Sequence, residues 1–235
     1  MPTRKVPLVT GEYYHVFNRG INHRRTFTAE NNYRDYSRAI ETLTYYRPMN
    51  NKLKYSYFLA RPKDEQRDIL SKFTKLSNRV TIVAFCLMPN HFHLLLKQEE
   101  DGGISQYLAD FQNSYTKYFN AKHKRSGALF DRQFKAVLVE SENQLLHLTR
   151  YIHLNPYSSN LITYDQITNY PYSSLTEYLS GKYHLSRPDT ALDIYPKRYE
   201  SFVLDHADYQ QQLETLKHIG IDIETCLNTP GVLAL

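Results

Sequence analysis

The sequence predicts an α+β protein with a ferredoxin-like split βαβ core, in which a central antiparallel sheet carries helices on one face, plus a C-terminal helical appendage. Three observations support this class. The predicted elements run strand, helix, strand, strand, helix, strand, and then continue as helices. A tight turn joins the two central strands into a hairpin. Beyond residue 157 the chain becomes rich in Tyr, Ser and Asn, so we divide it into a core domain at 1–157 and an appendage at 158–235.

The first strand and the first helix are predicted near the N-terminus. Residues 13–18 alternate in polarity enough to form a strand, and the segment 19–22 is typical of the turn that ends one. Thr28 is a suitable N-cap for a helix over 29–46, which Pro48 stops. These two elements form the first strand-and-helix unit of the core.

The predicted hairpin occupies the middle of the chain. Residues 55–59 are compatible with a short strand or a loop, and residues 63–76 predict an exposed helix. Residues 80–87 are apolar and β-branched, as in a buried strand. The turn at 88–90 contains a proline, which presets φ and lacks a donor for the ladder. Residues 91–97 then return as the antiparallel partner.

The second strand-and-helix unit follows the hairpin. Apolar residues at helical spacing predict an amphipathic helix over 105–123, after a pair of glycines. Residues 134–139 predict the last strand, and residues 145–153 predict a helix that the Asn155-Pro156 dipeptide ends. A further short helix is predicted at 198–206, within the appendage.

Composition limits the classes of protein that this chain can belong to. Hydrophobic residues make up 41% of its 235 residues, which is enough for a sizeable core. The net charge of +5 suits a polyanionic partner, although ordinary soluble proteins also reach it. The chain has 21 Tyr, which can stack on unpaired bases but mostly pack cores. It shows neither a signal-peptide core nor an apolar run of spanning length, so we expect a cytoplasmic protein that contacts no membrane.

Two histidines at the start of a predicted strand offer half of a metal site. His91 and His93 flank Phe92, and alternate strand residues share a face, so both imidazoles project together while Phe92 turns into the core. Neutral imidazole is the commonest metal ligand. A bound divalent ion can polarise a phosphate or carbonyl oxygen. Two unrelated surface histidines at this spacing are the plainer alternative.

The helix after the hairpin offers a candidate nucleophile. We expect this helix to pack across the sheet that carries the histidines, so a tyrosine on its inward edge within 110–120 would face the metal. A phenol with its ordinary pKa of about 10 is a poor nucleophile until a cation or a base assists it. A divalent ion would give that assistance and would stabilise the charge that develops on an attacked phosphate.

The combined motifs resemble those of the single-tyrosine transposases with a His-hydrophobe-His ("HUH") motif, and in particular the REP-associated tyrosine transposases. The resemblance covers roughly residues 12–180, and the joint pattern is far more specific than any one piece. The matching segments are Tyr14–Gly20, Cys86–Leu95, Ser114–Asn120, Gly127–Phe130, Arg150–Pro156 and Tyr170–Ser174.

The resemblance implies cleavage and rejoining of single-stranded DNA, with 1–157 as the catalytic domain. Tyr115 would attack a phosphate, form a 5′-phosphotyrosyl link and release a 3′-hydroxyl, which could later reseal the strand. His91 and His93 would hold Mg²⁺ or Mn²⁺ with an oxygen ligand from the helix of the nucleophile. Asn120 is the candidate for that ligand, although it lies about 140° around the helix from Tyr115, and Gln112 competes with it.

The resemblance also implies a nucleic-acid partner. REP-associated relatives recognise imperfect palindromes with a short 5′ tetranucleotide, so we expect single-stranded or hairpin DNA and a monomeric protein. Basic residues near the predicted site would neutralise phosphates, although a solvated charged face is nearly as good an interpretation. The candidates are Arg19, Arg24, Arg25, Lys122, Lys124, Arg125, Arg132 and Lys135.

Two other functions are compatible with the same motifs. A protein that kept the fold without cutting would be a regulator that binds hairpin DNA or RNA, but the intact histidine pair and tyrosine argue against that interpretation. A metal-dependent hydrolase could instead use water, with Tyr115 purely structural. A covalent link between protein and DNA would separate the transposase from both alternatives.

Overall fold

The structure, a computed structural model, describes residues 7–29, 34–49, 51–188 and 191–218. Four strands form one antiparallel sheet in the order β2-β3-β1-β4. Consecutive strands are thus either hairpin partners or separated by one intervening strand, which confirms the predicted split βαβ arrangement. The strands are β1 (Tyr13–Arg19), β2 (Val80–Met88), β3 (His91–Gln98) and β4 (Lys135–Leu138).

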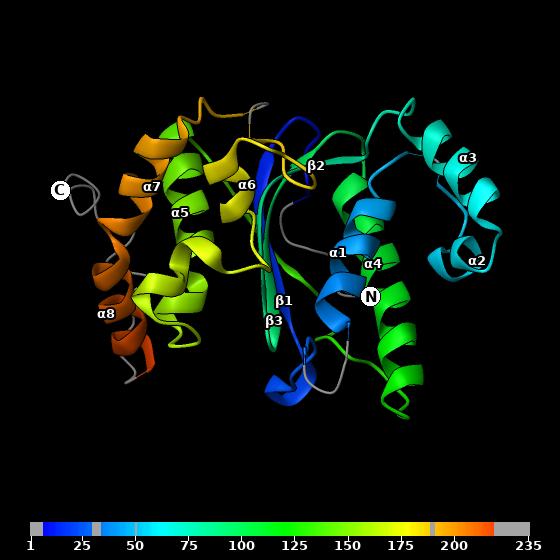
Figure 1. Ribbon diagram of the computed structural model, residues 1–235, viewed down its shortest axis with the longest axis horizontal. Coiled ribbons are helices and arrows are strands. Elements are labelled where there is room, and N and C mark those ends of the chain that lie inside the picture. The colour runs from blue at the N-terminus through cyan, green and yellow to red at the C-terminus, as the bar shows by residue number, and fades with distance from the viewer. Residues whose placement is uncertain (1–6, 30–33, 50, 189–190, 219–235) are drawn as a thin grey trace.

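Helices cover both faces of the sheet, so the expectation of helices on one face is wrong. Figure 1 shows the sheet edge-on between a layer with α1 and α4 and a layer with α5, α7 and α8. Within the described ranges, no helix is long and apolar enough to cross a lipid bilayer. The helices are α1 (Asp35–Tyr45), α2 (Tyr55–Leu59), α3 (Lys63–Phe73), α4 (Gly103–Lys122), α5 (Glu142–Ser158), α6 (Leu175–Ser180), α7 (Pro196–Leu204) and α8 (Ala207–His218), with 3₁₀ turns η1 (Ile21–His23) and η3 (Tyr164–Asn169).

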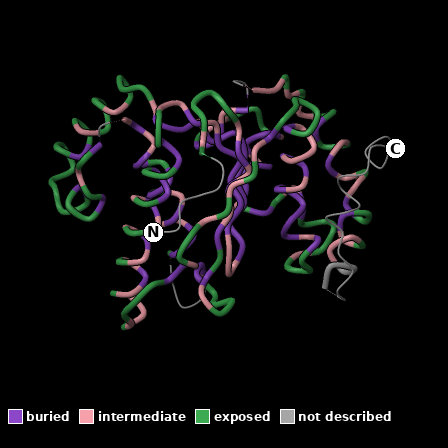
Figure 2. The backbone as a smooth tube through the Cα atoms, turned by 180° about the vertical axis from the view of Figure 1, so that it is seen from behind, coloured by how far each residue is buried: buried purple, intermediate pink, exposed green. Residues whose placement is uncertain are grey.

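Each face of the sheet has its own hydrophobic core because side chains alternate along the strands. Phe92 and Leu94 of β3 pack with Phe111 and Tyr115 of α4 on one face. Leu95 of β3 packs on the other face, in a core that α5 and the elements after it share. The buried backbone in Figure 2 accordingly runs through the strands and the inner helices, while the outer helices α2 and α3 are largely exposed.

Three predicted elements differ from the structure. Residues 55–59 are the short helix α2, because Tyr55 and Phe58 lie three residues apart and bury the same side. Helix α5 does not end at Asn155-Pro156 but continues to Ser158. Helix α1 begins at Asp35, and residues 30–33 of the predicted helix lie outside the described residues. Thr28 does not cap this helix through its backbone, since its hydroxyl donates to the Asp35 carboxylate at 2.9 Å.

The segment after α5 packs against β2 and closes its outer edge. The amide of Leu87 donates to the carbonyl of Tyr172 at 2.8 Å, and the amide of Ser174 donates to the carbonyl of Phe85 at 3.0 Å. This pairing satisfies backbone groups that an open sheet edge would expose. The division of the chain at residue 157 stays a prediction.

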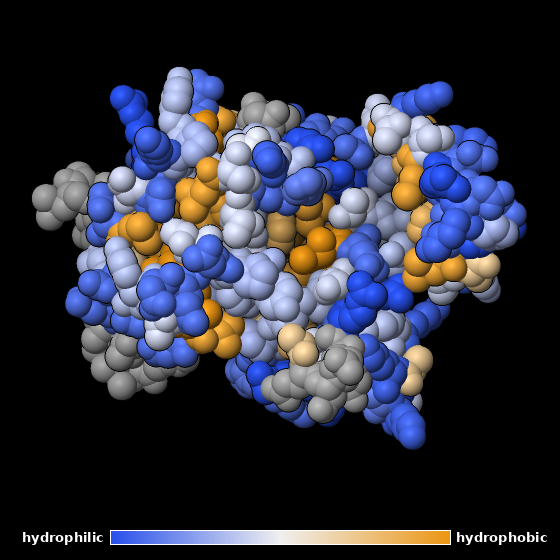
Figure 3. Space-filling model, viewed as in Figure 1, coloured by the Kyte–Doolittle hydropathy of each residue, from blue (hydrophilic) through white to orange (hydrophobic). Residues whose placement is uncertain are grey.

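The face in Figure 3 is mostly hydrophilic, with apolar patches between the two helix layers.

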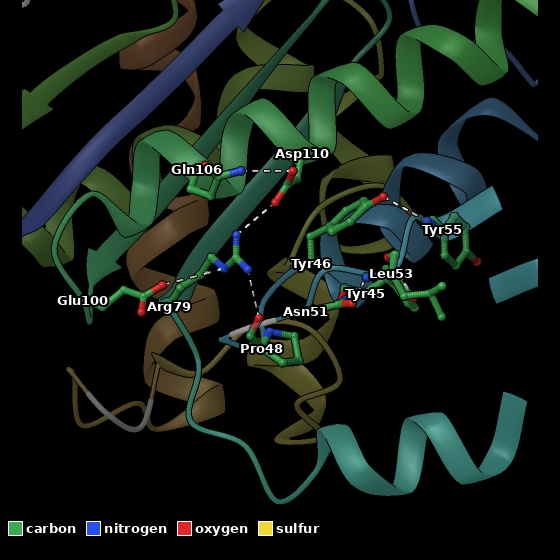
Figure 4. Close-up of polar contacts among 10 residues, drawn as sticks. All are labelled: Tyr45, Tyr46, Pro48, Asn51, Leu53, Tyr55, Arg79, Glu100, Gln106 and Asp110. Carbon is green, nitrogen blue, oxygen red and sulfur yellow. Dashed lines mark hydrogen bonds and ion pairs between the residues drawn. The ribbon is translucent and has the colours of Figure 1, made fainter. Parts of the chain in front are cut away.

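A buried arginine ties the start of β2 to α4 (Figure 4). The Arg79 guanidinium donates to the Asp110 carboxylate at 2.9 Å and to the carbonyl of Pro48 at 3.3 Å, and it lies 3.9 Å from the Glu100 carboxylate. Its side chain is only 5% exposed. A buried charge needs such partners because desolvation is costly. This cluster fixes the end of the sheet where α4 begins.

We expect Arg79→Met to lower the free energy of unfolding by about 2–3 kcal/mol, because Asp110 would lose its partner while keeping some contact with solvent. Arg61→Met is the matched control, since Arg61 forms an exposed pair with Glu65 at i,i+4. The control should cost about 0.5 kcal/mol or less. Urea unfolding of the two variants measures both values, and equal costs would contradict the role given to Arg79.

Candidate functional site

The histidine pair lies on the α5 face of the sheet. In the register of β1 and β3, Arg19 is opposite His91 and Phe17 is opposite His93. Opposed residues of antiparallel strands share a face. The two imidazoles therefore share one surface with Arg19 and Phe17. Their rings meet edge to face, with centroids 5.0 Å apart.

One nitrogen of each imidazole has a defined protein partner. His91 Nδ1 lies 2.6 Å from Asn90 Oδ1, and because an amide oxygen only accepts, Nδ1 donates and Nε2 carries the lone pair of the neutral ring. His93 Nδ1 lies 2.9 Å from His15 Nε2. When His15 accepts that bond, His93 also presents its lone pair at Nε2. Such outer contacts orient histidines that bind metals.

Burial keeps the rings of His91 and His15 neutral at physiological pH. Desolvation lowers the pKa of His91 to about 4, although a side-chain hydrogen bond with Asn155 acts in the opposite direction. Desolvation also lowers the pKa of His15 to about 4. Neutral imidazole is the form that coordinates a metal ion, so the environment favours the ligand state over the cation.

Helix α5 brings a tyrosine and an asparagine to the histidines. Tyr151 lies edge to face against His93, with ring centroids 5.9 Å apart, and against His15 at 6.0 Å. Asn155 follows one turn later on the same side of the helix and hydrogen-bonds His91. The Asn155 amide also donates to the carbonyl of Tyr151 at 3.0 Å. The two residues thus form one unit opposite the histidine pair.

Buried hydrogen bonds fix the rotation of α5 about its axis. His153, between the two site residues, contacts the Ser174 hydroxyl at 2.7 Å and the Tyr199 hydroxyl at 2.8 Å through its two ring nitrogens. Ser174 in turn accepts from the amide of Phe85 in β2. Because His153 faces the core, Tyr151 and Asn155 must face along the sheet toward His91 and His93.

The turn after β1 carries basic residues to the rim of the site. The amide of Gly20 donates to the carbonyl of Asn90 at 2.7 Å, which joins this turn to the hairpin. A Cβ at Gly20 would lie 2.4 Å from the carbonyl oxygen of Arg24, so only glycine allows this close approach. The turn therefore folds back tightly and holds His23 and Arg25 beside His91.

These side chains surround a pocket of about 700 Å³. His91, His93, Tyr151 and Asn155 line it from β3 and α5, and Glu214 of α8 reaches its wall. Its lining also includes Phe17, Arg19, His23, Arg25, Asp131, Gln133 and Lys135. The site therefore combines imidazoles, a phenol and an amide with a rim that is mainly basic.

The structure does not bring Tyr115 to the histidines, so its expected position is wrong. Tyr115 is fully buried, and its hydroxyl donates to the carbonyl of Thr26 at 2.5 Å. Its ring packs against Phe27 at 5.1 Å. The physical reason is the alternation along β3: α4 packs on the face of Phe92, whereas the two histidines point to the opposite face. Burial also raises the pKa of Tyr115 well above its usual value.

The two candidate oxygen ligands on α4, Asn120 and Gln112, also lie away from the histidine pair. Asn120 accepts from Arg125 at 2.6 Å and donates to the carbonyl of Gly127 at 2.8 Å, which closes the turn after the helix. Gln112 accepts from the Asn18 amide at 3.1 Å, on the Phe92 face of the sheet. Asn155, and neither of these two residues, lines the pocket with His91 and His93.

The predicted DNA-binding residues fall into two groups. Arg19, Arg25 and Lys135 line the pocket, and Arg24 and Arg132 are chain neighbours of residues that line it. Lys122, Lys124 and Arg125 lie at the end of α4 and in the turn that follows. Desolvation and then repulsion from Arg24 lower the pKa of Arg125, so these two guanidinium groups lie near each other.

Sequence reasoning missed Tyr151 and Asn155 as site residues, and it favoured a structural role for His15, which lies on the first strand and could approach the site. The signal for the first two was present, because Arg150–Pro156 is one of the segments that carry the resemblance. Because the Asn155-Pro156 dipeptide predicts the end of a helix, the sequence does not place these residues at the site. Pro156 instead lies inside α5, one residue after Asn155.

The donor set suits a divalent metal ion. His91 and His93 could supply two imidazoles from one strand and Asn155 a harder oxygen ligand, a combination compatible with Mg²⁺, Mn²⁺ and other divalent ions. In the part of the chain that the structure describes, no cluster of three His, Cys, Asp or Glu side chains could hold a metal.

Comparisons with known proteins point to one group of enzymes. The sequence profile of the IS200-like transposases matches residues 39–155. A Haemophilus influenzae protein provisionally named REP-associated tyrosine transposase is 26% identical over 102 residues, which cover 39% of this chain and 57% of that protein. The chain thus spans little more than half the length of this relative. These matches confirm the resemblance inferred from the motifs.

A solved structure shares the fold. The structure of a REP-associated tyrosine transposase bound to a REP hairpin matches with a TM-score of 0.52 and 15% identity, covering 83% of this chain and 96% of that one. At this identity the likeness establishes the architecture, and it agrees with the α+β arrangement of one antiparallel sheet and flanking helices.

We expect Tyr115→Phe to lower the free energy of unfolding by about 1–2 kcal/mol, because the carbonyl of Thr26 would lose its buried donor. Tyr57→Phe is the control, since Tyr57 is 60% exposed and should change stability by less than about 0.5 kcal/mol. Thermal or urea unfolding measures both. No change in Tyr115→Phe would contradict the buried hydrogen bond.

We expect His15→Leu to weaken Mn²⁺ binding about 10-fold or more, because His93 would lose the partner that orients its ring. His184→Leu is the control, because it removes an exposed histidine that does not line the pocket, and it should leave the affinity unchanged. Calorimetric titration of the protein alone measures the affinity, and ¹⁵N shifts of His93 report which nitrogen is protonated. Unchanged affinity in His15→Leu would remove His15 from this role.

Proposed function

Since residues 39–155 belong to the IS200-like transposase family, we propose that this chain is a metal-dependent single-stranded DNA endonuclease and strand transferase whose nucleophile is Tyr151. The observation that carries the proposal is the meeting of Tyr151 and Asn155 of α5 with His91 and His93 of β3 in one pocket with a basic rim. A nucleophile, a metal site and phosphate-binding groups are the three components that strand transfer requires.

In the proposed reaction, the Tyr151 phenol oxygen attacks a backbone phosphorus. A phosphotyrosine bond forms to the 5′ phosphate of the DNA that lies 3′ of the cut, and the bond from phosphorus to the 3′ oxygen of the other segment breaks. The phenol proton is transferred to that oxygen, which departs as a 3′-hydroxyl. A divalent ion held by His91, His93 and Asn155 would polarise the phosphate and stabilise its developing charge. Attack by a 3′-hydroxyl reverses these steps and reseals a strand, so no external energy source is needed.

The surrounding residues support this chemistry by position. Arg19, Arg25 and Lys135 would neutralise phosphates on either side of the attacked one. The second basic group, at the end of α4, continues from Arg24 through Arg125 and would contact a more distant part of the DNA, such as the stem of a hairpin. The solved relative is described as bound to a REP hairpin, which supports hairpin DNA as the substrate. Mg²⁺ or Mn²⁺, a monomeric state and a cytoplasmic location stay predictions.

We expect incubation with labelled hairpin oligonucleotides and Mn²⁺ to give a protein–DNA adduct that survives denaturation. The adduct should carry the DNA that lies 3′ of the cut. Tyr151→Phe should abolish it, because the variant keeps the ring and removes only the attacking oxygen. Denaturing gels with 5′ and 3′ labels identify both products.

Two tyrosines provide controls for this experiment. Tyr115→Phe should retain the adduct, and so should Tyr157→Phe, which alters a phenol on the same helix that donates to Asp208. An adduct kept in Tyr151→Phe and lost in Tyr115→Phe would overturn the assignment. Binding of hairpins without any adduct would favour the regulator, and cleavage without an adduct would favour a hydrolase that uses water.

A further inference from the structure

An aromatic ring lies in the floor of the pocket, between the histidines and the edge of the sheet. Phe17 is the Cα partner of His93 on β3 and of Lys135 on β4. Because opposed residues share a face, His93, Phe17 and Lys135 form one row across three strands. Phe17 is partly exposed and lines the pocket, whereas the neighbouring Val16 and Asn18 are buried on the other face.

The Phe17 ring packs against histidines on one side, and on its other side it borders exposed residues of β4. The Phe17 ring is tilted by 30° against His93, with centroids 5.7 Å apart, and lies 5.0 Å from the ring of His15. On the other side, Lys135 Nζ is 5.7 Å from the Phe17 ring. Lys135 and Val137 are the exposed residues of β4 on this face. The sheet surface beyond Phe17 is therefore accessible.

The charges around the ring indicate the kind of ligand. Lys135 lies over the ring, and Arg19 lies two residues along the same strand face, where Asp131 holds its guanidinium at 2.9 Å with both side chains largely exposed. An aromatic face bordered by cations suits a planar group attached to an anionic chain. Unpaired nucleotides in single-stranded DNA have this chemistry, since every base has a π face and a neighbouring phosphate.

We propose that Phe17 is a stacking platform for the unpaired base next to the attacked phosphate, with Lys135 contacting the phosphate of that nucleotide. The proposal rests on the proposed function, because the position of the base is set by a phosphate held between His93 and Tyr151. A base stacked there would orient the strand across the sheet, from the histidine pair toward β4. Phe17 is thus a positioning residue that places the scissile phosphate.

The chain provides a matched control on the same strand. Tyr13 lies four residues before Phe17 on the same face of β1, is also partly exposed, and has Lys97 Nζ 6.0 Å from its ring. It lines a different pocket with Glu12, Glu140 and Asp193, where carboxylates would repel DNA. Tyr13→Leu therefore removes a comparable aromatic ring with a lysine above it, outside the proposed path.

The experiment uses the full chain carrying Tyr151→Phe, so that DNA stays uncut, without added metal. The probes are DNA hairpins with a single-stranded 5′ tail of thymidines or adenosines, and matched hairpins with one abasic residue at each tail position in turn. We expect an abasic residue at one position to weaken binding roughly 5-fold to 100-fold. Phe17→Leu should weaken binding of the intact hairpin by a similar factor, and Phe17→Trp should preserve it.

The combination of the two changes distinguishes stacking from a structural role. If the base stacks on Phe17, the Phe17→Leu variant should bind the intact hairpin and the hairpin abasic at that position with equal affinity. Abasic residues at the other positions should lower the affinity of this variant as much as they do in the parent protein. Tyr13→Leu should leave the affinity for every hairpin probe unchanged. The platform would be overturned if Phe17→Leu weakened the binding of every probe, intact or abasic, by the same factor. In that case the effects of the variant and of the abasic residue on the binding free energy would simply add at every position. Failure of the parent protein to bind any hairpin would overturn the proposed function itself, and the platform with it.

Discussion

The alternation of side chains along β3 is the constraint on which the site depends. Phe92 points into the core with α4, so His91 and His93 must point to the face that α5 covers. A shift of one residue in the register would exchange these faces and bury the histidines beneath α4. The apolar residue between the histidines thus decides which helix can supply a nucleophile. The same register places Phe17 and Lys135 in one row with His93.

Helix α5 completes the site because its other side is anchored. His153 is fully enclosed, and its two contacts join α5 to the Ser174 segment and to α7. Gln210 of α8 donates to the carbonyl of Tyr151 at 3.0 Å, so the last described helix also contacts the segment that carries the phenol. The elements after residue 158 therefore support the position of Tyr151, although they contribute few groups to the pocket itself.

The sequence was sufficient for the order of strands and helices along the chain, for the hairpin, and for the shared face of the two histidines, because each follows from local periodicity and turn chemistry. The choice of nucleophile depends on which helix covers which face, and that information is not local. Tyr115 and Tyr151 both lie on amphipathic helices next to apolar residues, so their sequence surroundings look alike. They differ because they lie on opposite faces of the sheet, where Tyr115 is in the core and Tyr151 is beside the histidines. Pro156 obscured the second helix, because the usual cost of an internal proline suggested an end that the packing of α5 overrides. The first strand places His15 near the predicted site, but only the pairing of the strands shows that its ring contacts His93.

Tyr151 and Asn155 are one turn apart on a single helix, and this spacing has a mechanical consequence. One helical turn joins the proposed attacking oxygen to the amide that would complete the metal site, so a displacement of α5 as a whole would carry both. Any tilt or slide of α5 would withdraw both from the histidines at once, and its return would restore both. The distance between α5 and β3 would then determine whether the proposed centre is assembled. A single motion of this helix could control strand transfer.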